Sequence, residues 1–129
     1  MKKPEIKKLD KLWSLQIHAN GKEKCQSCGK TKAQSFLNAC HIVGRAHRST
    51  RWGCFVEENG QKVYILAGFC GCYVCHKAYD SHSPKEAYIR KYVIKDEMYD
   101  KIHNEAIKIA DNQDYETIKG LITSCKRNV

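Results

Sequence analysis

Two short stretches, CQSC at Cys25–Cys28 and CYVC at Cys72–Cys75, decide how this chain folds. Each places two thiols at a spacing that lets both reach one metal ion from a single turn. Two such pairs supply the four thiolates of a closed tetrahedral zinc site, which is structural because no coordination position is left for a substrate. The 43 residues from 29 to 71 must leave this ion and return to it. We therefore expect the zinc to hold a functional insertion in place.

Other uses of the cysteines fit the pattern less well. Buried free thiols or a dithiol redox site are the alternatives, but two correctly spaced pairs rarely arise together. Cys70 competes with Cys72 as a ligand because the chain reads CGC there, and the CxxC spacing favours Cys72. Cys54 and Cys125 are most simply small buried apolar residues.

Length and composition indicate one small domain, spanning 1–129, with a modest core. The chain lacks a run of about 18 apolar residues, and MKKPEIKKLDKLW at its start lacks the apolar stretch of a signal peptide. We therefore expect no membrane segment and a cytosolic (bacterial or phage-infected host) location, where cysteines indicate metal rather than disulfides.

The charge is unevenly distributed. The net charge is +9, and residues 1–50 hold 11 Lys and Arg against 3 acids, whereas residues 51–129 hold 12 against 11. A basic surface suggests a nucleic-acid partner, although a solvated lysine-rich helix gives the same sum.

Apolar periodicity predicts helices on both sides of the cysteine region. From Pro4 to the Asn20-Gly21 stop, the residues at helical spacing are Ile6, Leu9, Trp13 and Ile17. The capping signature Ser83-Pro84-Lys85-Glu86 predicts a helix to about Lys95. Two more helices are predicted, one from Met98, Ile102, Ala106 and Ile109, and one after the cap candidate Asp114 from Ile118, Leu121, Ile122 and Cys125.

The middle of the chain is predicted to be less regular. Cys54 to Leu66, CFVEENGQKVYIL, predicts two strands around an Asn59-Gly60 turn. Residues 25–46 show no clear period, as expected of a loop region organised by metal. The expected α+β order is a basic helix (1–22), a zinc-knuckle core (23–82) and a helical region (83–129).

One histidine lies inside the insertion, and another follows the second CxxC pair. His41 lies 13 residues after Cys28, and His76 directly follows the last zinc ligand, so the layout could bring the two imidazoles together. A histidine near a divalent metal can act as general base toward water while the metal stabilises the departing phosphodiester oxygen. Each histidine taken alone is more often a structural residue, and it is their combination with a metal that favours phosphodiester chemistry.

The strings CQSCGK, ACHIVGRAHRSTRW, AGFCGCYVCH and SHSPKEAYIRKY resemble the HNH endonucleases of bacteriophages and prophages, a zinc-bearing ββα-metal class. The resemblance covers Cys25 to about Tyr92, roughly half of the chain. It implies a small zinc-knuckle ββα-metal (HNH) core flanked by the N-terminal helix and C-terminal helices. It also implies metal-dependent hydrolysis of DNA.

The resemblance assigns roles to individual residues. His41 takes the place of the general base, and Cys40 and His76 take those of ligands to a second divalent ion, Mg²⁺, Mn²⁺, Ni²⁺ or Zn²⁺. His82 matches a family histidine that helps hold metal or phosphate. The candidates for gripping the DNA backbone are the basic residues Arg45, Arg51 and Lys77.

Two positions depart from the family pattern. Cys40 replaces the usual acid or histidine, and a thiolate favours softer ions than Mg²⁺. Ala67 stands where an asparagine normally orients the base, while Asn59 belongs more naturally to the predicted turn. The alternative to an endonuclease is therefore an inactive zinc-stabilised protein of this fold that binds nucleic acid or modulates a host protein. The sequence does not decide the oligomeric state.

Overall fold

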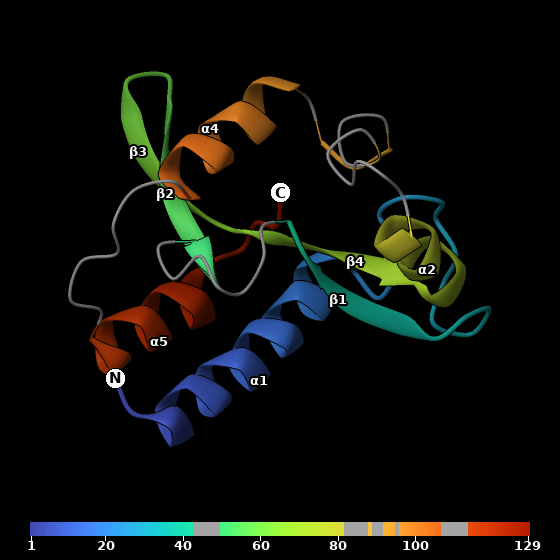
Figure 1. Ribbon diagram of the computed structural model, residues 1–129, viewed down its shortest axis with the longest axis horizontal. Helices are drawn as coiled ribbons and strands as arrows, with labels where there is room; N and C mark the ends of the chain where they lie inside the picture. Colours follow the sequence, from blue (N-terminus) through green and yellow to red (C-terminus); the bar gives the residue numbers. More distant parts are fainter. Residues whose placement is uncertain (43–49, 82–87, 89–91, 95, 107–113) are drawn as a thin grey trace.

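The computed structural model has a mixed α+β architecture with two small antiparallel sheets (Figure 1). It describes residues 1–42, 50–81, 88, 92–94, 96–106 and 114–129. The elements in chain order are α1 (Lys3–Asn20), β1 (Leu37–His41), β2 (Gly53–Glu58), β3 (Gln61–Leu66), β4 (Gly68–Cys72), α2 (Tyr73–Ser81), α4 (Asp96–Ala106) and α5 (Tyr115–Ser124).

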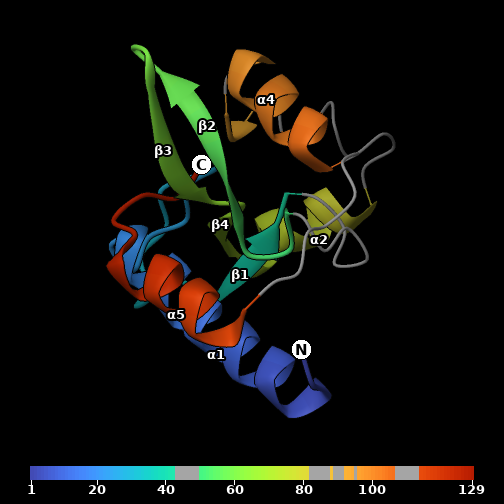
Figure 2. The same cartoon turned by 90° about the vertical axis from the view of Figure 1, so that its left-hand side faces the viewer.

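Helix α1 forms where its apolar period predicts. Its buried stripe is Leu9, Trp13 and Ile17, and its first turn is closed by a hydrogen bond from the Lys2 amide to the Glu5 carboxylate (2.9 Å). α5 lies beside α1 in both views (Figures 1 and 2), and its Ile122 shares the core with the α1 stripe. One of the two hydrophobic cores therefore lies between these helices and the sheet of β1 and β4.

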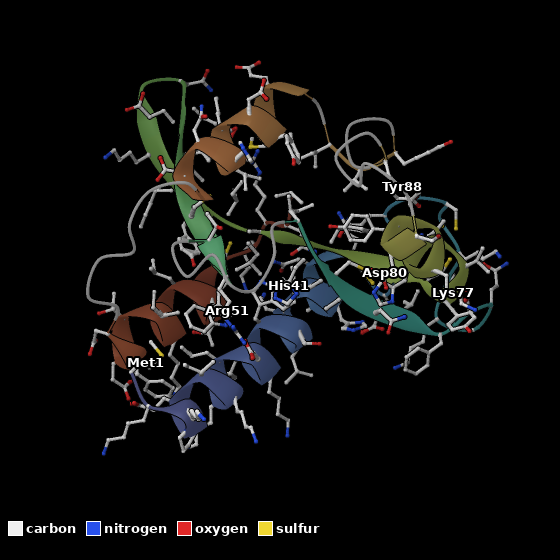
Figure 3. All side chains as sticks on the ribbon, viewed as in Figure 1. Met1, His41, Arg51, Lys77, Asp80 and Tyr88 are labelled. Carbon is white, nitrogen blue, oxygen red and sulfur yellow. The ribbon has the colours of Figure 1, made fainter. Side chains whose placement is uncertain are left out.

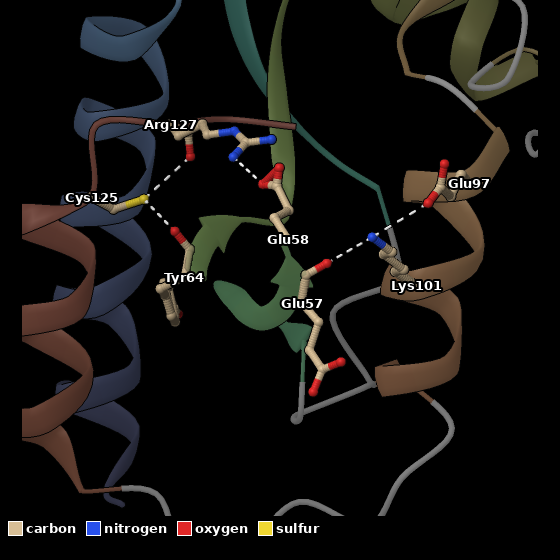
Figure 4. Close-up of polar contacts among 7 residues, drawn as sticks. All are labelled: Glu57, Glu58, Tyr64, Glu97, Lys101, Cys125 and Arg127. Atoms are coloured by element: carbon tan, nitrogen blue, oxygen red, sulfur yellow. Dashed lines mark hydrogen bonds and ion pairs between the residues drawn. The ribbon is translucent and has the colours of Figure 1, made fainter. Parts of the chain in front are cut away.

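The β2–β3 hairpin confirms the predicted Asn59-Gly60 turn. Both turn residues have positive φ (51° and 77°), as a two-residue turn of matching twist requires. Polar contacts join the hairpin to α4 and to the residues that follow α5 (Figure 4). Lys101 of α4 donates to the Glu57 carbonyl (2.8 Å), Arg127 pairs with Glu58, and the Cys125 thiol donates to the Tyr64 carbonyl (3.4 Å).

Strands β1 and β4 were not predicted, and β1 lies within residues 25–46, where an irregular loop was expected. They pair antiparallel from Leu37↔Cys72 to His41↔Gly68. β4 is buried along its whole length, and β1 is at least half-buried, so neither shows the polar–apolar alternation that reveals a strand. Tertiary burial, rather than local preference, makes these segments extended.

The β1–β4 sheet is covered by a different helix on each face. The Cβ that Gly68 lacks would meet the Trp13 ring of α1 at 2.3 Å, so α1 packs directly on one face. On the other face, the ring of Phe69 packs edge-on against Tyr79 of α2 (5.5 Å between centroids). Because His41 pairs with Gly68 and Cys40 pairs with Phe69, successive side chains of β1 also point to different helices.

The C-terminal predictions are confirmed in part. α4 and α5 form, and the Asp114 carboxylate caps α5 by accepting from the Thr117 amide (3.0 Å). α5 packs on α1, and α4 packs on β2. Most of the helix predicted at 83–95 lies outside the described residues. Within the described ranges, no helix is long and apolar enough to cross a membrane.

Candidate metal centre

Four cysteines from the two CxxC stretches come together: Cys25, Cys28, Cys72 and Cys75. Their sulfur atoms all lie within 4.8 Å of one another, and within the described residues this is the group of three or more ligand-type side chains that could hold an ion. The Sγ atoms of Cys28 and Cys72 are 3.7 Å apart. Zn–S bonds of about 2.3 Å in a tetrahedron separate the sulfur atoms by about 3.8 Å. The arrangement therefore fits a tetrahedral zinc ion, and metal binding by this set is supported.

The first pair is shaped by a tight turn. The amide of Cys25 donates to the Lys30 carbonyl (2.8 Å), and the amide of Gly29 donates to the Cys25 carbonyl (2.8 Å). Gly29 has φ of +83°, a conformation that few other residues adopt at low cost. The turn also aims the Cys28 amide at the Cys25 sulfur (3.4 Å), which stabilises negative charge there.

The second pair sits at the junction of β4 and α2. Cys72 ends the strand, and Cys75 lies in the first turn of the helix, where its amide points at the Cys72 sulfur (3.5 Å). Gln26 connects the two pairs. Its backbone N–H donates to the Cys70 carbonyl (2.7 Å), and its side-chain oxygen accepts from the Cys70 backbone N–H (2.8 Å). Backbone contacts thus bring both pairs together.

The thiols of the set differ in acidity. Burial opposes ionisation of Cys25, but hydrogen bonds from the backbone of Cys72, Cys28 and Ser27 outweigh it and lower the pKa to about 7. Burial, and the side-chain contact with Cys72, raise the pKa of Cys75 to about 12. Thiolates this close repel one another, so a dication is needed for all four to ionise together.

Cys72 rather than Cys70 belongs to the set, as the CxxC spacing predicts. The Cys70 side chain is buried and its sulfur lies 3.9 Å from Nδ1 of His18 in α1. Burial, and the neighbouring Cys25, raise the pKa of the Cys70 thiol to about 11. Cys70 is a packed neutral thiol between α1 and the metal centre.

Cys40 is buried in the core on the α2 side of β1. Its side chain is 2% exposed, and its sulfur lies 3.8 Å from the Asn38 carbonyl oxygen. Burial, and the Asp80 carboxylate, raise its pKa to about 12. It is therefore a neutral thiol. Cys40 as a metal ligand stays a prediction, and its burial gives no support to that role.

His41, the next residue, points to the opposite face. Its ring stacks on the indole of Trp13 (4.1 Å between centroids, 18° between planes), and its Nε2 is buried (Figure 3). The carboxylate of Asp10, one helical turn before Trp13, interacts electrostatically with His41. The imidazole is thus held in a defined orientation by α1.

Asp10 is also the partner of Arg51. The guanidinium makes a two-pronged ion pair with it (3.0 and 2.7 Å), and the indole of Trp52 donates to the same carboxylate (2.9 Å). Burial would raise the pKa of Asp10, but the bonds from Arg51 and Trp52 outweigh it and hold the pKa below its ordinary 3.8. Arg51 is one of the residues expected to contact the DNA backbone; its guanidinium is engaged in this intramolecular pair, and the DNA contact stays a prediction.

The remaining predicted residues lie on or near α2. The His76 imidazole nitrogen Nε2 is 3.3 Å from the Asp80 carboxylate, one helical turn away. Lys77 is exposed, and its ammonium lies 5.1 Å from the centre of the Tyr73 ring (Figure 3). Asp80 was not identified from the sequence, although the spacing His-x-x-x-Asp on a helix is a usable signal. Arg45 and His82 lie outside the described residues.

Neither Ala67 nor Asn59, the two positions considered for the asparagine that orients the base, contributes a side chain that could orient His41. Ala67 is fully buried; its amide donates to the Trp52 carbonyl (3.0 Å), and its carbonyl accepts from the Ile42 amide (3.2 Å). Asn59 occupies the tip of the β2–β3 hairpin. Around His41, Trp13 and Asp10 occupy the positions from which an imidazole can be oriented.

Comparison with known proteins leaves the family open. No family model, no curated protein and no solved structure matches the chain.

Proposed function

We propose that this chain is a zinc-stabilised, metal-dependent DNA endonuclease of the HNH, ββα-metal type, with His41 as general base. The observation that carries the proposal is the junction of β1 with α2. The hydroxyl of Tyr79 donates to the His41 carbonyl (2.6 Å), so the end of β1 is bonded to the helix turn that bears His76 and Asp80. A base candidate and two metal-ligand side chains thereby come from adjoining elements beside the cysteine set.

In this proposal His41 accepts a proton from the attacking water. Stacking on Trp13 fixes the plane of the ring, and the negative charge of Asp10 favours the imidazolium that forms. These two residues act as positioning residues. They take over the role that an asparagine has in the family and that Ala67 cannot fill.

His76 and Asp80 are the proposed ligands of the second ion, with His82 as a further predicted one. Ligand atoms about 2.1 Å from an octahedral ion lie about 3 Å apart, close to the 3.3 Å between Nε2 of His76 and the Asp80 carboxylate. An imidazole with a carboxylate suits Mn²⁺, Ni²⁺ or Zn²⁺ as well as Mg²⁺. When bound, the ion would stabilise charge on the departing oxygen.

A second candidate is a DNA-binding protein of the same fold without cleavage activity. The observation that favours it is the direction of the His41 side chain, which faces α1, whereas Cys40 and α2 lie on the other face of β1. In that case zinc at the cysteine set keeps the fold, and the basic first half of the chain binds phosphates.

Plasmid nicking separates the two candidates. The zinc-loaded protein is incubated with supercoiled plasmid and Mg²⁺, Mn²⁺, Ni²⁺ or Zn²⁺, beside His41→Gln, Asp80→Asn and the control His103→Gln, which changes an exposed histidine on α4. Loss of a general base costs about 10²- to 10⁴-fold in rate. We expect such a loss in His41→Gln, a loss of nicking in Asp80→Asn because the second ion would bind less tightly, and no loss in the control.

The endonuclease proposal fails if no ion supports nicking above the His41→Gln background. DNA binding with a steep salt dependence would then favour the binding protein. Absence of DNA binding would point instead to a protein partner. Zinc content and melting temperature, measured for each variant, distinguish loss of chemistry from loss of fold.

A further inference from the structure

An exposed aromatic surface lies beside the metal centre and plays no part in the proposed cleavage. We call the knuckle face the set Phe36, Tyr73, Val74 and Lys77. Phe36, Tyr73 and Val74 are 74%, 52% and 58% exposed, although all three are large and apolar. The other exposed large apolar residues of the described chain, Met1, Leu15, Phe55 and Tyr92, are distributed over other elements.

The backbone holds the two rings of this face close together. Tyr73 donates its amide to the Phe36 carbonyl (2.9 Å), which extends the β1–β4 pairing by one step beyond Leu37↔Cys72. Directly opposed residues of an antiparallel pair have Cβ atoms about 5 Å apart. The two rings are therefore neighbours. Phe36 directly precedes β1, and Tyr73 lies between the ligands Cys72 and Cys75.

The surroundings of the knuckle face are basic. The ammonium of Lys77 lies over the Tyr73 ring (5.1 Å), and Lys77 is exposed in the middle of α2 (Figure 3). Residues 24–38 contain three lysines and no acid, and Lys30 is exposed in the turn between the first two ligands and β1. Lys32 is partly balanced by Glu23, 4.0 Å away. The face thus combines exposed aromatic rings with the Lys77 ammonium, and the chain segment that leads into it carries lysines and no acid.

We infer that the knuckle face binds unpaired nucleotides of a DNA substrate by stacking bases on Phe36 and Tyr73 while Lys77 neutralises phosphate. Exposed aromatic rings within a positive groove or patch recognise single strands, because every unpaired base offers a π-face. In a duplex the faces of the bases are already stacked on one another, so these aromatic rings should add little binding free energy there. A protein partner fits less well, because lysine is depleted in the buried centre of such interfaces.

This inference rests on the proposed binding of DNA and narrows it to substrates with unpaired segments. A junction, a flap or a gap would present such a segment next to duplex. The knuckle face would then hold the substrate, while His41 and α2 supply the chemistry.

The test measures affinity for a fluorescent oligothymidine of about 12 nucleotides, a length within the range that single-strand proteins cover. A duplex of equal length is measured in parallel, in both cases with zinc-loaded protein and no added divalent ion. Phe36→Ala and Tyr73→Ala should each weaken single-strand binding about 5- to 100-fold and leave duplex binding almost unchanged. Tyr73→Phe, which keeps the ring, should bind as the native chain does.

Two controls sharpen the result. Phe55→Ala removes an aromatic ring of exposure close to that of Tyr73 (47% against 52%) from β2 in the other sheet, and it should not change single-strand affinity. Lys77→Gln should reduce the slope of log affinity against log salt by about 0.7, the value for one phosphate contact on a single strand.

The inference is overturned if Phe36→Ala and Tyr73→Ala bind the oligothymidine as tightly as the native chain. Native binding to duplex DNA in that case leaves the proposed function standing. If the native chain binds neither single-stranded nor duplex DNA, the inference fails, and the nicking assay with added ions decides the proposed function. Sedimentation completes the test: if Tyr73→Ala converts a dimer to a monomer with unchanged affinity for the single strand, the face joins two copies of the chain instead.

Discussion

Removing the metal from the four-cysteine set should unfold the chain. Structural zinc binds small domains with about 10–16 kcal/mol of apparent free energy at neutral pH, whereas a domain of this size has about 5–15 kcal/mol of total stability. Here the ion would connect residues 25–28 with residues 72–75, and Cys25 and Cys72 belong to the core shared by α1 and α5. Without it, at least about 5 kcal/mol should be lost, which corresponds to a fall in melting temperature of about 20 °C.

The assay follows zinc release and structure together. A metal indicator should report one zinc per chain, released as a strong chelator is added, and circular dichroism should show the helices melting over the same chelator range. Cys72→Ser removes one ligand and should prevent stoichiometric zinc binding. Cys54→Ala is the matched control, since Cys54 is a buried thiol outside the set. It should keep the zinc and lose only about 1 kcal/mol.

Two results would refute this reasoning. One is a purified chain that carries no metal yet melts cooperatively at the temperature of the zinc-loaded form. The other is a Cys54→Ala variant that loses zinc as Cys72→Ser does, which would mean that the four sulfur atoms do not form the site.

Two further predictions concern stability. Asp10→Asn should cost about 1–3 kcal/mol at pH 7, because it removes the charged partner of Arg51. The native pKa of Asp10 is depressed below 3.8, so this stabilisation is present above that value and is lost as the pH falls through the native pKa. Urea titrations should therefore show the gap between native and variant constant above about pH 5 and shrinking below pH 4; a gap that widens in acid would contradict the assignment. Gly68→Ala should cost about 1–3 kcal/mol or more, because its Cβ would lie 2.3 Å from the Trp13 ring, whereas Gly120→Ala, with open space in α5, should be neutral or stabilising by up to about 1 kcal/mol. Equal denaturation midpoints for the two alanine variants would argue against close packing of α1 on β4.

Local signals in the sequence predicted the elements that depend on local physics. The stripe of α1, the Asn59-Gly60 turn and the Asp114 cap each follow from a backbone preference or a period that neighbouring residues determine. Strand β4 could not be found in this way. GFCGC has two glycines, no alternation and low strand preference, and it is extended because burial and pairing with β1 hold it so.

The site shows the same division. The four cysteine ligands were predictable because spacing along the chain alone implies their convergence. The direction of the His41 side chain was not predictable, because it depends on the register of β1. A shift of one residue in that register exchanges the faces to which Cys40 and His41 point. Asp10 was missed since its link to His41 and Arg51 crosses from α1 to residues more than 30 positions later.

The contacts of α1 with the residues that follow α5 can form only late in synthesis. Asn20 donates to the Cys125 carbonyl, 105 positions later, and the Ile17 carbonyl accepts from the Asn128 side chain, 111 positions later. During translation α1 emerges first, whereas these partners follow α5 in the chain. Contacts this distant in sequence also slow folding. The hydrogen bonds that hold the end of α1 to these residues should therefore form only after residue 128 has emerged, whereas the apolar stripe of α1 is covered by segments that emerge earlier.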